Sequence, residues 1–427
     1  MKGSSLRSAY RLLDVKMSEL LWAALITLLL FQPALQDAVP VLSWLDETVV
    51  LLLAVMSMAG AFGGKRTLPQ FAKGSLMCLG LFVLICLAGN ALSGFPGAFV
   101  PIAIDAFTCV KFFIAAVSGM VVFSDAERML DVMTFLVKVL LVVIAVCATL
   151  SFVTDIGMTH QLVRYGLRPF EFVFSHPTYL VAALVGMVVL LSADSRNNIW
   201  WIVLASAVMV LTLRGKAMGF AALVLLIVFL TRNGKKTLGV LQVVLLGVVA
   251  LVIGWGQIEA YFGSEGQARF ELLRTSLQIS SDNFPLGAGF ASFGSAVTAD
   301  PEWYSPLYFQ YGVSSVWGLS LENSAFISDS FWPTVLGQSG CLGLVAYCGS
   351  LAMLIRAMGM RANLKLPILL LFAYLFISST SESAFFNPSS IYLVLCAVVA
   401  ATAKVRPFAA DDAGQIGNAL DIVEVMK

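Results

Sequence analysis

The sequence predicts an all-α polytopic membrane protein, and three observations carry this fold class. Hydrophobic residues make up 59% of the 427-residue chain and charged residues only 12%, whereas soluble proteins carry about 25% charged residues. The mean hydropathy is +0.91. The apolar residues are also gathered into runs of about 20, which is the length that a helix needs to cross a bilayer.

These runs predict about twelve transmembrane helices. The seventh and eighth runs meet almost without a loop at Arg214–Lys216, so this short pair could also form one kinked unit. The expected helices cover roughly 19–36, 48–63, 72–92, 100–123, 132–153, 178–193, 199–213, 215–231, 237–255, 332–355, 364–379 and 389–404.

One long segment between apolar runs, Trp255–Gly343, is not a membrane span. Loops of this length usually carry function or are disordered, and its many aromatic residues argue against disorder. We therefore expect function to lie here. The chain divides into helices 1–9 (1–255), a large loop between helices 9 and 10 (256–331), helices 10–12 (332–404) and a C-terminal tail (405–427).

The basic residues predict the orientation, because Lys and Arg favour cytoplasmic loops. Most of the 26 fall on the side of the N-terminus, which places both termini in the cytoplasm and the long loop outside. Positive charge kept on the opposite side suggests a bound anion. For Arg269 and Arg274 the alternative explanation is an ordinary ion pair on one helix face, of Glu265 with Arg269 and of Glu271 with Arg274. The exceptions are Arg164, Arg168, Arg214, Lys216, Arg269 and Arg274.

Composition and motifs exclude several functions. The net charge of +1 argues against a nucleic acid partner, and two histidines without HExxH or CxxC argue against a metal site. No Walker lysine is present, and the segment around Gly287 and Gly289 is best explained as a tight turn. We therefore expect no cofactor. A synthetic reaction would then draw its energy from an activated substrate or a gradient.

Two charged residues fall within the fourth expected helix. Asp105 lies shallowly on the outer side, and Lys111 lies deeper, where a charge must face protein or water. A structural pair with a buried acid explains Lys111 at least as well as a functional site does.

Three segments resemble a known family. They are RPFEFVFSHPTYLVAAL (Arg168–Leu184), TLRGKAMGF (Thr212–Phe220) and ARFELLRTSLQISSDNFPLGAGFASF (Ala268–Phe293). In this order they resemble the O-antigen ligase and polysaccharide polymerase superfamily, whose members are inner-membrane proteins with one large periplasmic loop near the C-terminus. The resemblance covers about 160–350. It puts Arg214 on the family's key arginine and Arg269 on a second one, with Arg274 as the other choice.

One motif separates the branches of this family. Ligases carry a histidine followed by Asn, Ser or Gln, nine residues, Gly, two residues, and Gly, Thr or Tyr. Counted back from Gly340 and Gly343, this frame falls on Asp329–Ser330. Aspartate in place of histidine favours a polymerase.

The resemblance implies a metal-independent glycosyltransferase that moves a growing glycan from undecaprenyl diphosphate onto a lipid-linked repeat unit. Arginines would bind the diphosphate, and a carboxylate would accept the proton of the attacking hydroxyl. Asp329 is the first choice of base and Glu322 the second, with Glu382 third; Asp329 could instead cap a helix. The expected diphosphate-binding residues are Arg214 and Arg269, supported by Arg168, Lys216 and Arg274.

The expected partners are the lipid-linked oligosaccharide, membrane lipids and a chain-length regulator. Loop aromatics would suit stacking on sugar rings or anchoring at the interface. They are Trp303, Tyr304, Tyr308, Tyr311 and Trp317.

Two other functions stay open. A ligase of the same family would transfer glycan to lipid A core. A transporter of an anionic substrate would use the arginines for binding, but it would predict inverted repeats, and none is visible in the sequence.

Overall fold

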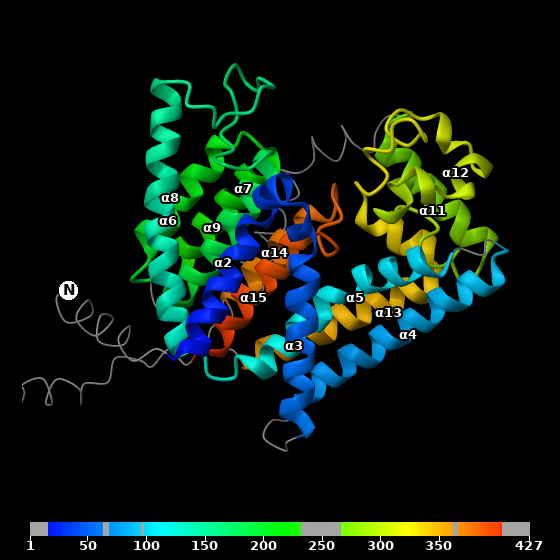
Figure 1. Ribbon diagram of the computed structural model, residues 1–427, viewed down its shortest axis with the longest axis horizontal. Coiled ribbons are helices and arrows are strands. Elements are labelled where there is room, and N and C mark those ends of the chain that lie inside the picture. The colour runs from blue at the N-terminus through cyan, green and yellow to red at the C-terminus, as the bar shows by residue number, and fades with distance from the viewer. Residues whose placement is uncertain (1–15, 63–67, 95–97, 232–265, 362–365, 404–427) are drawn as a thin grey trace, which may run out of the picture.

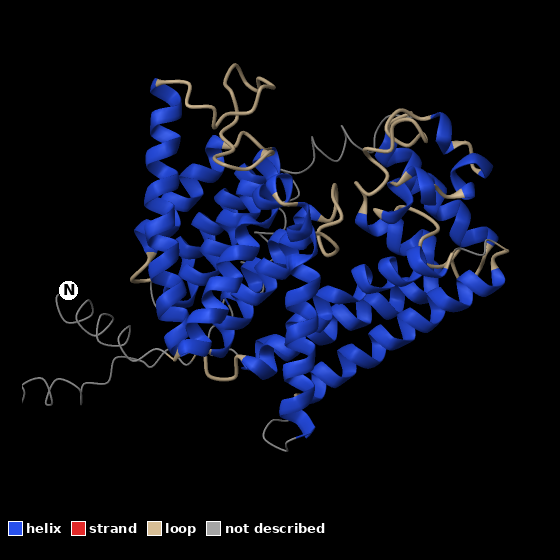
Figure 2. Ribbon diagram, viewed as in Figure 1, coloured by secondary structure: helices blue, strands red, loops and turns tan. Residues whose placement is uncertain are grey.

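The computed structural model describes residues 16–62, 68–94, 98–231, 266–361 and 366–403. Across these residues the regular elements are helices, and β-structure is limited to two isolated bridges in the segment 159–170 (Figure 2). The expectation of an all-α protein is therefore confirmed for this part of the chain.

The α-helices follow the apolar runs of the sequence. Short 3₁₀ turns join several of them, and the expected ninth helix, 237–255, lies outside the described residues. The α-helices are α2 (Met17–Ala38), α3 (Leu45–Phe62), α4 (Gln70–Leu92), α5 (Phe99–Val122), α6 (Glu127–Val153), α7 (Pro177–Leu191), α8 (Ile199–Leu211), α9 (Gly215–Thr231), α11 (Ala268–Asp282), α12 (Pro306–Gln310), α13 (Phe331–Arg361), α14 (Leu366–Ser378) and α15 (Pro388–Thr402).

Seven of the described helices are long and apolar enough to cross a membrane, which is the character of a polytopic membrane protein. Four more apolar helices, α8, α9, α14 and α15, have 13 to 17 residues and are shorter than a full span. The short pair at Arg214 is two helices. The chain breaks between α8 and α9 because Leu213 adopts a left-handed conformation, with φ 49°.

The helices form two groups (Figure 1). On the left of the figure, α2, α6, α7, α8, α9, α14 and α15 form a bundle. On the right, α4, α5 and α13 run diagonally, and α11 and α12 lie above their upper ends. Helix α15 is central, since it packs against α2, α5 and α7 and every residue from Ser390 to Thr402 is buried.

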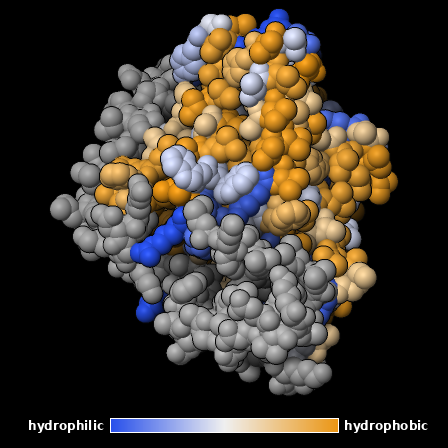
Figure 3. Space-filling view, turned by 90° about the vertical axis from the view of Figure 1, so that its left-hand side faces the viewer, coloured by the Kyte–Doolittle hydropathy of each residue, from blue (hydrophilic) through white to orange (hydrophobic). Residues whose placement is uncertain are grey.

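The outer surface is apolar where lipid is expected. Figure 3 views the side of the molecule that carries α6, and most of the described surface there is hydrophobic. Helix α6 exposes Phe135, Val139, Val142 and Val146. Exposed apolar area of this extent marks a face that contacts membrane or a partner, and the length and hydropathy of α6 favour membrane.

Helix α13 is broken at Gly340, where φ is 61° and ψ is −166°. The glycine-rich turn of 285–290 lies at this break. Its N–H groups donate to helix carbonyls, from Ala288 to Gly337 O at 3.0 Å and from Gly289 to Gln338 O at 2.8 Å. The turn thus satisfies carbonyl groups that the interrupted helix leaves open. Backbone geometry explains the glycines, as expected.

Two side chains hold this turn on the membrane helices. Asn90 of α4 donates to Phe290 O and accepts from Phe290 N, both at 2.9 Å. Asp105 of α5 accepts from Ala291 N, Ser295 Oγ and Gln338 Nε2 at 2.6 to 2.8 Å. A buried carboxylate needs several donors, so Asp105 has a structural role here.

Lys111 is a structural residue too. Its ammonium group lies 2.6 Å from Asp46 and 2.7 Å from Glu47, both at the start of α3, and its side chain is only 3% exposed. The expected buried acid is therefore present, and the pair joins α3 to α5.

Residues 266–330 build a small core of their own. Leu272, Phe293, Leu307 and Leu319 are fully buried in it, together with Tyr308. The Tyr308 hydroxyl accepts from Gly294 N and contacts Thr298. Tyr308 is therefore a core residue, and its suggested use as a stacking surface for sugars is wrong. The ring of Trp317, by contrast, is exposed at the surface.

Candidate functional site

The site begins with an ion pair between distant segments. Arg269, in the first turn of α11, donates to Asp329 at 2.7 Å, and Asp329 stands just before α13. Both side chains are mostly shielded, 18% and 31% exposed. Burial raises the pKa of Asp329 above its ordinary value, while the Arg269 charge opposes this.

A second pair lies beside the first. Lys216, in the first turn of α9, is 3.3 Å from Glu382 in the loop between α14 and α15. These side chains are 22% and 18% exposed. Lys216 therefore has an acidic partner in a partly shielded position.

The side chain of Arg214 contacts a histidine. The guanidinium group lies 2.5 Å from Nε2 of His176, the residue that caps the start of α7. The pKa of His176 is lowered to about 4, because burial and then the charge of Arg214 disfavour the imidazolium form. His176 is therefore neutral at pH 7.

The three contacts belong to one site, which we call the charged cluster: Arg214, Lys216, Arg269, His176, Glu382 and Asp329. Glu382 raises the pKa of Asp329 and Lys216 lowers it, so the two ion pairs are close enough to interact electrostatically. Glu382 also raises the pKa of His176. In addition, the Ser383 hydroxyl donates to Ser328 O, which ties the Glu382 loop to the segment that carries Asp329.

Helix starts provide most of these side chains. His176 caps α7, Arg214 immediately precedes α9, Arg269 opens α11, and Asp329 stands two residues before α13. Helix N-termini carry partial positive charge and unpaired N–H groups. Cationic side chains at several helix starts make this a region suited to an anion.

The remaining predicted residues lie differently. Arg168 is exposed, pairs with Asp155 at 3.2 Å, and borders a small hollow of about 220 Å³ at the end of α6. Arg274 is exposed and lies 3.8 Å from Glu271, which is the helix pair expected as the alternative. Glu322 lies at the surface of its turn. The structure gives these three residues no contact with the charged cluster.

His176 is a cluster residue that the sequence did not single out, and Glu382, the third choice of base, lies in the cluster as the partner of Lys216. His176 lies inside the segment Arg168–Leu184 that resembles the family, and this position was the signal that could have identified it. No motif of fixed spacing includes His176, so the sequence alone assigned it no chemical role. Its ring lies edge-on to His160 at 5.6 Å, and His160 faces Glu171 at 3.5 Å. Among the described residues, no group of three metal-binding side chains occurs.

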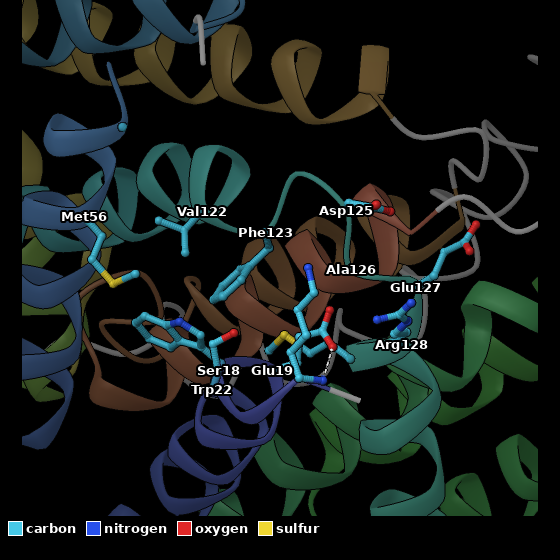
Figure 4. Close-up of a pocket in the computed structure, with 13 residues that line it drawn as sticks. Ser18, Glu19, Trp22, Met56, Val122, Phe123, Asp125, Ala126, Glu127 and Arg128 are labelled. Atoms are coloured by element: carbon cyan, nitrogen blue, oxygen red, sulfur yellow. Dashed lines mark hydrogen bonds between the residues drawn. The ribbon is translucent and has the colours of Figure 1, made fainter. Parts of the chain in front are cut away.

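A larger cavity lies elsewhere. It holds about 730 Å³ and is lined by Trp22, Phe123 and the start of α6 (Figure 4). The loop that leads to His176 follows the opposite end of α6, and 27 residues of helix span about 40 Å. This cavity is therefore separate from the charged cluster.

In chemical terms, the cluster combines three basic side chains with two carboxylates and a neutral imidazole. Arginine binds phosphate oxygens through two parallel N–H groups. A partly buried carboxylate with a raised pKa is suited to accept a proton near neutral pH. The residue types of the cluster are therefore those that anion binding and general-base catalysis require.

Comparison of the chain with protein-family models, with curated proteins and with solved structures finds no match.

Proposed function

We propose that the protein is a polysaccharide polymerase of the bacterial inner membrane. It transfers a growing glycan from undecaprenyl diphosphate onto the next lipid-linked repeat unit. The supporting observation is the charged cluster itself. Arg269 pairs there with the partly buried carboxylate of Asp329, while Lys216 pairs with Glu382 and Arg214 contacts His176.

The reaction needs two functions that the cluster can supply. The bond between the sugar anomeric carbon and the diphosphate breaks, and negative charge develops on the leaving diphosphate. Arg214 and Arg269 stabilise that charge, with Lys216 beside them. Asp329 accepts the proton of the attacking sugar hydroxyl as the new glycosidic bond forms. The driving force comes from the activated diphosphate linkage.

Substrate binding must rearrange the resting contacts. Arg269 is held by Asp329, and Lys216 faces Glu382. A diphosphate carries more charge than a single carboxylate and can accept two parallel hydrogen bonds from Arg269. Its arrival releases Asp329 from the ion pair and leaves the carboxylate available as base.

The proposal includes a topology. Twelve helices with both termini in the cytoplasm place the starts of α7, α9, α11 and α13 at the periplasmic face, where lipid-linked repeat units are polymerised. The exposed apolar side of α6 and the seven long apolar helices are consistent with this arrangement.

Arg269→Ala tests the proposal in cells that lack the native copy. Loss of one charge-stabilising donor should lower polymerisation by about 10²- to 10³-fold, so the long-chain ladder on a glycan gel disappears while single repeat units still reach the surface. Arg274→Ala, about one and a half turns along the same helix and exposed, is the matched control and should keep the ladder. Protein levels are compared by immunoblot.

Other outcomes identify the alternatives. Polymer that accumulates on the carrier lipid, with no glycan attached at the surface, would indicate a ligase. An unchanged ladder in both Arg269→Ala and Arg214→Ala would overturn the proposed function and favour a transporter.

A further inference from the structure

His176 has an unusual hydrogen-bonding position. Its Nε2 faces the Arg214 guanidinium at 2.5 Å, and its Nδ1 faces the backbone N–H of Thr178 at 3.3 Å. Guanidinium and backbone N–H groups donate and never accept. Both ring nitrogens therefore face obligate donors.

A neutral imidazole cannot satisfy both. One ring nitrogen carries a proton and the other carries the lone pair, so the ring has one acceptor. Protonation of the ring would leave it no acceptor, and the pKa of about 4 keeps it neutral at pH 7. At any moment, therefore, the ring can accept a hydrogen bond from only one of these two donors.

Distance and charge decide the resting arrangement. Hydrogen bonds from a charged donor are shorter and stronger than those between neutral groups, and the Arg214 contact is the shorter of the two. At rest, Nε2 accepts from Arg214 and the ring proton is on Nδ1. With its proton on Nδ1 the ring cannot accept from Thr178 N, so in this tautomer the His176 side chain does not cap α7.

We propose that His176 binds the same anion as Arg214 and changes tautomer when it does so; this inference rests on the proposed function. When an anion binds the guanidinium of Arg214, the hydrogen bond from Arg214 to Nε2 of His176 is broken. The ring proton leaves Nδ1 to water and a proton returns at Nε2, so the net charge of the ring is unchanged. Nε2 then donates to the anion, and Nδ1 accepts from Thr178 N.

The exchange has two consequences. The anion gains a second donor beside Arg214, and α7 gains the side-chain cap that the resting tautomer lacks. Arg214 and His176 come from different helix starts, so the bound anion also joins α7 to α9. A phosphoryl group, with oxygens on several sides, has the shape for such a bridge.

The chain is well suited to a direct test, because His160 and His176 are its only histidines. Protein labelled with ¹⁵N in the histidine rings and carrying His160→Gln shows one ring by NMR in detergent micelles. Without ligand, Nε2 should have the chemical shift of an unprotonated nitrogen. Inorganic pyrophosphate is the probe for the diphosphate group. At saturation, Nδ1 should have the chemical shift of an unprotonated nitrogen and Nε2 that of a protonated one.

Binding affinity provides the second measurement. His176→Asn keeps a side chain that caps helices well but is too short to replace Nε2 at the anion. It should weaken pyrophosphate binding by about tenfold, the usual loss for one hydrogen bond to a charged group. His160→Gln, a change in the neighbouring ring, should alter the affinity by less than about twofold.

The outcomes separate this inference from the proposed function. Pyrophosphate that binds in an Arg214-dependent manner without changing the His176 tautomer would overturn the role of His176 alone. Pyrophosphate that does not bind the unaltered protein, or binds equally well to Arg214→Ala, would overturn both. A tautomer change that is lost in Arg214→Ala, together with weaker binding in His176→Asn, supports both.

Discussion

At the scale of single residues, environment separates side chains of one type. Asp155 is exposed and pairs with Arg168 at the surface. Asp105 is buried and its oxygens are taken by three donors that hold the loop in place. Asp329 is intermediate, since it is partly buried and forms an ion pair with Arg269, the pair that we propose a diphosphate displaces. Among these three, Asp329 therefore fits the proposed base best.

Asp329→Asn should lower polymerisation by about 10²- to 10⁴-fold, the usual contribution of a general base. The amide oxygen can still accept from Arg269, so the protein should accumulate normally. Initial rates with lipid-linked repeat units in detergent give the comparison. Glu322→Gln, at the surface of the same loop, should retain most of the activity; the reverse ranking would make Glu322 the base.

The pH dependence has a definite sign. A base works in its deprotonated form, and burial raises the pKa of Asp329. Activity should therefore fall as the pH drops through a value above the ordinary range of an aspartate.

At the scale of elements, the break in α13 and the glycine-rich turn depend on each other. The turn places its backbone against Gln338, and a Cβ on Gly287 would lie 2.4 Å from the Gln338 carbonyl carbon. That neighbour is backbone and cannot rotate away. The close approach also fixes the end of α11 against α13, and with it the segments that carry Arg269 and Asp329.

Gly287→Ala should destabilise the protein by about 1–3 kcal/mol, the usual cost of overpacking, and lower activity because the Arg269–Asp329 pair shifts. Thermal unfolding in detergent measures the first effect. Gly80→Ala is the matched control: this α4 glycine has open space around its Cβ position, so alanine should be neutral or stabilise by up to about 1 kcal/mol. Equal midpoints for the two variants would contradict the packing argument.

At the scale of the whole molecule, the charged cluster and the large cavity mark opposite ends of the bundle. The loop after α6 leads to His176, and the start of α6 lines the cavity. Polymerisation of lipid-linked units outside the cytoplasm requires that the end with the charged cluster faces the periplasm.

Two cysteine substitutions test this sidedness in a background without the seven native cysteines, all of which are free thiols. Gln161→Cys and Ser124→Cys lie in exposed segments after and before α6. A membrane-impermeant maleimide should label Gln161→Cys in intact spheroplasts and Ser124→Cys only after permeabilisation. The opposite pattern would place the charged cluster in the cytoplasm and rule out the proposed reaction.

The sequence by itself determined that the chain is a helical membrane protein and where most helices lie. Bilayer thickness fixes the length of an apolar run, and this is a local property. Sequence spacing also predicted the Glu271–Arg274 pair, since residues three apart share a helix face. The choice of Arg214, Lys216, Arg269 and Asp329 as one group came from their types and from the family resemblance.

Only the tertiary structure decided which side chains meet. Arg269 and Asp329 are 60 residues apart, and Arg214 and His176 are 38 apart. The members of the charged cluster come from the starts of α7, α9 and α11, from the segment before α13 and from the loop before α15, so their neighbours depend on how the whole bundle packs. The same packing buried Tyr308, left Arg168 and Arg274 at the surface, and gave His176 two donors for one acceptor. Local periodicity does not contain this information.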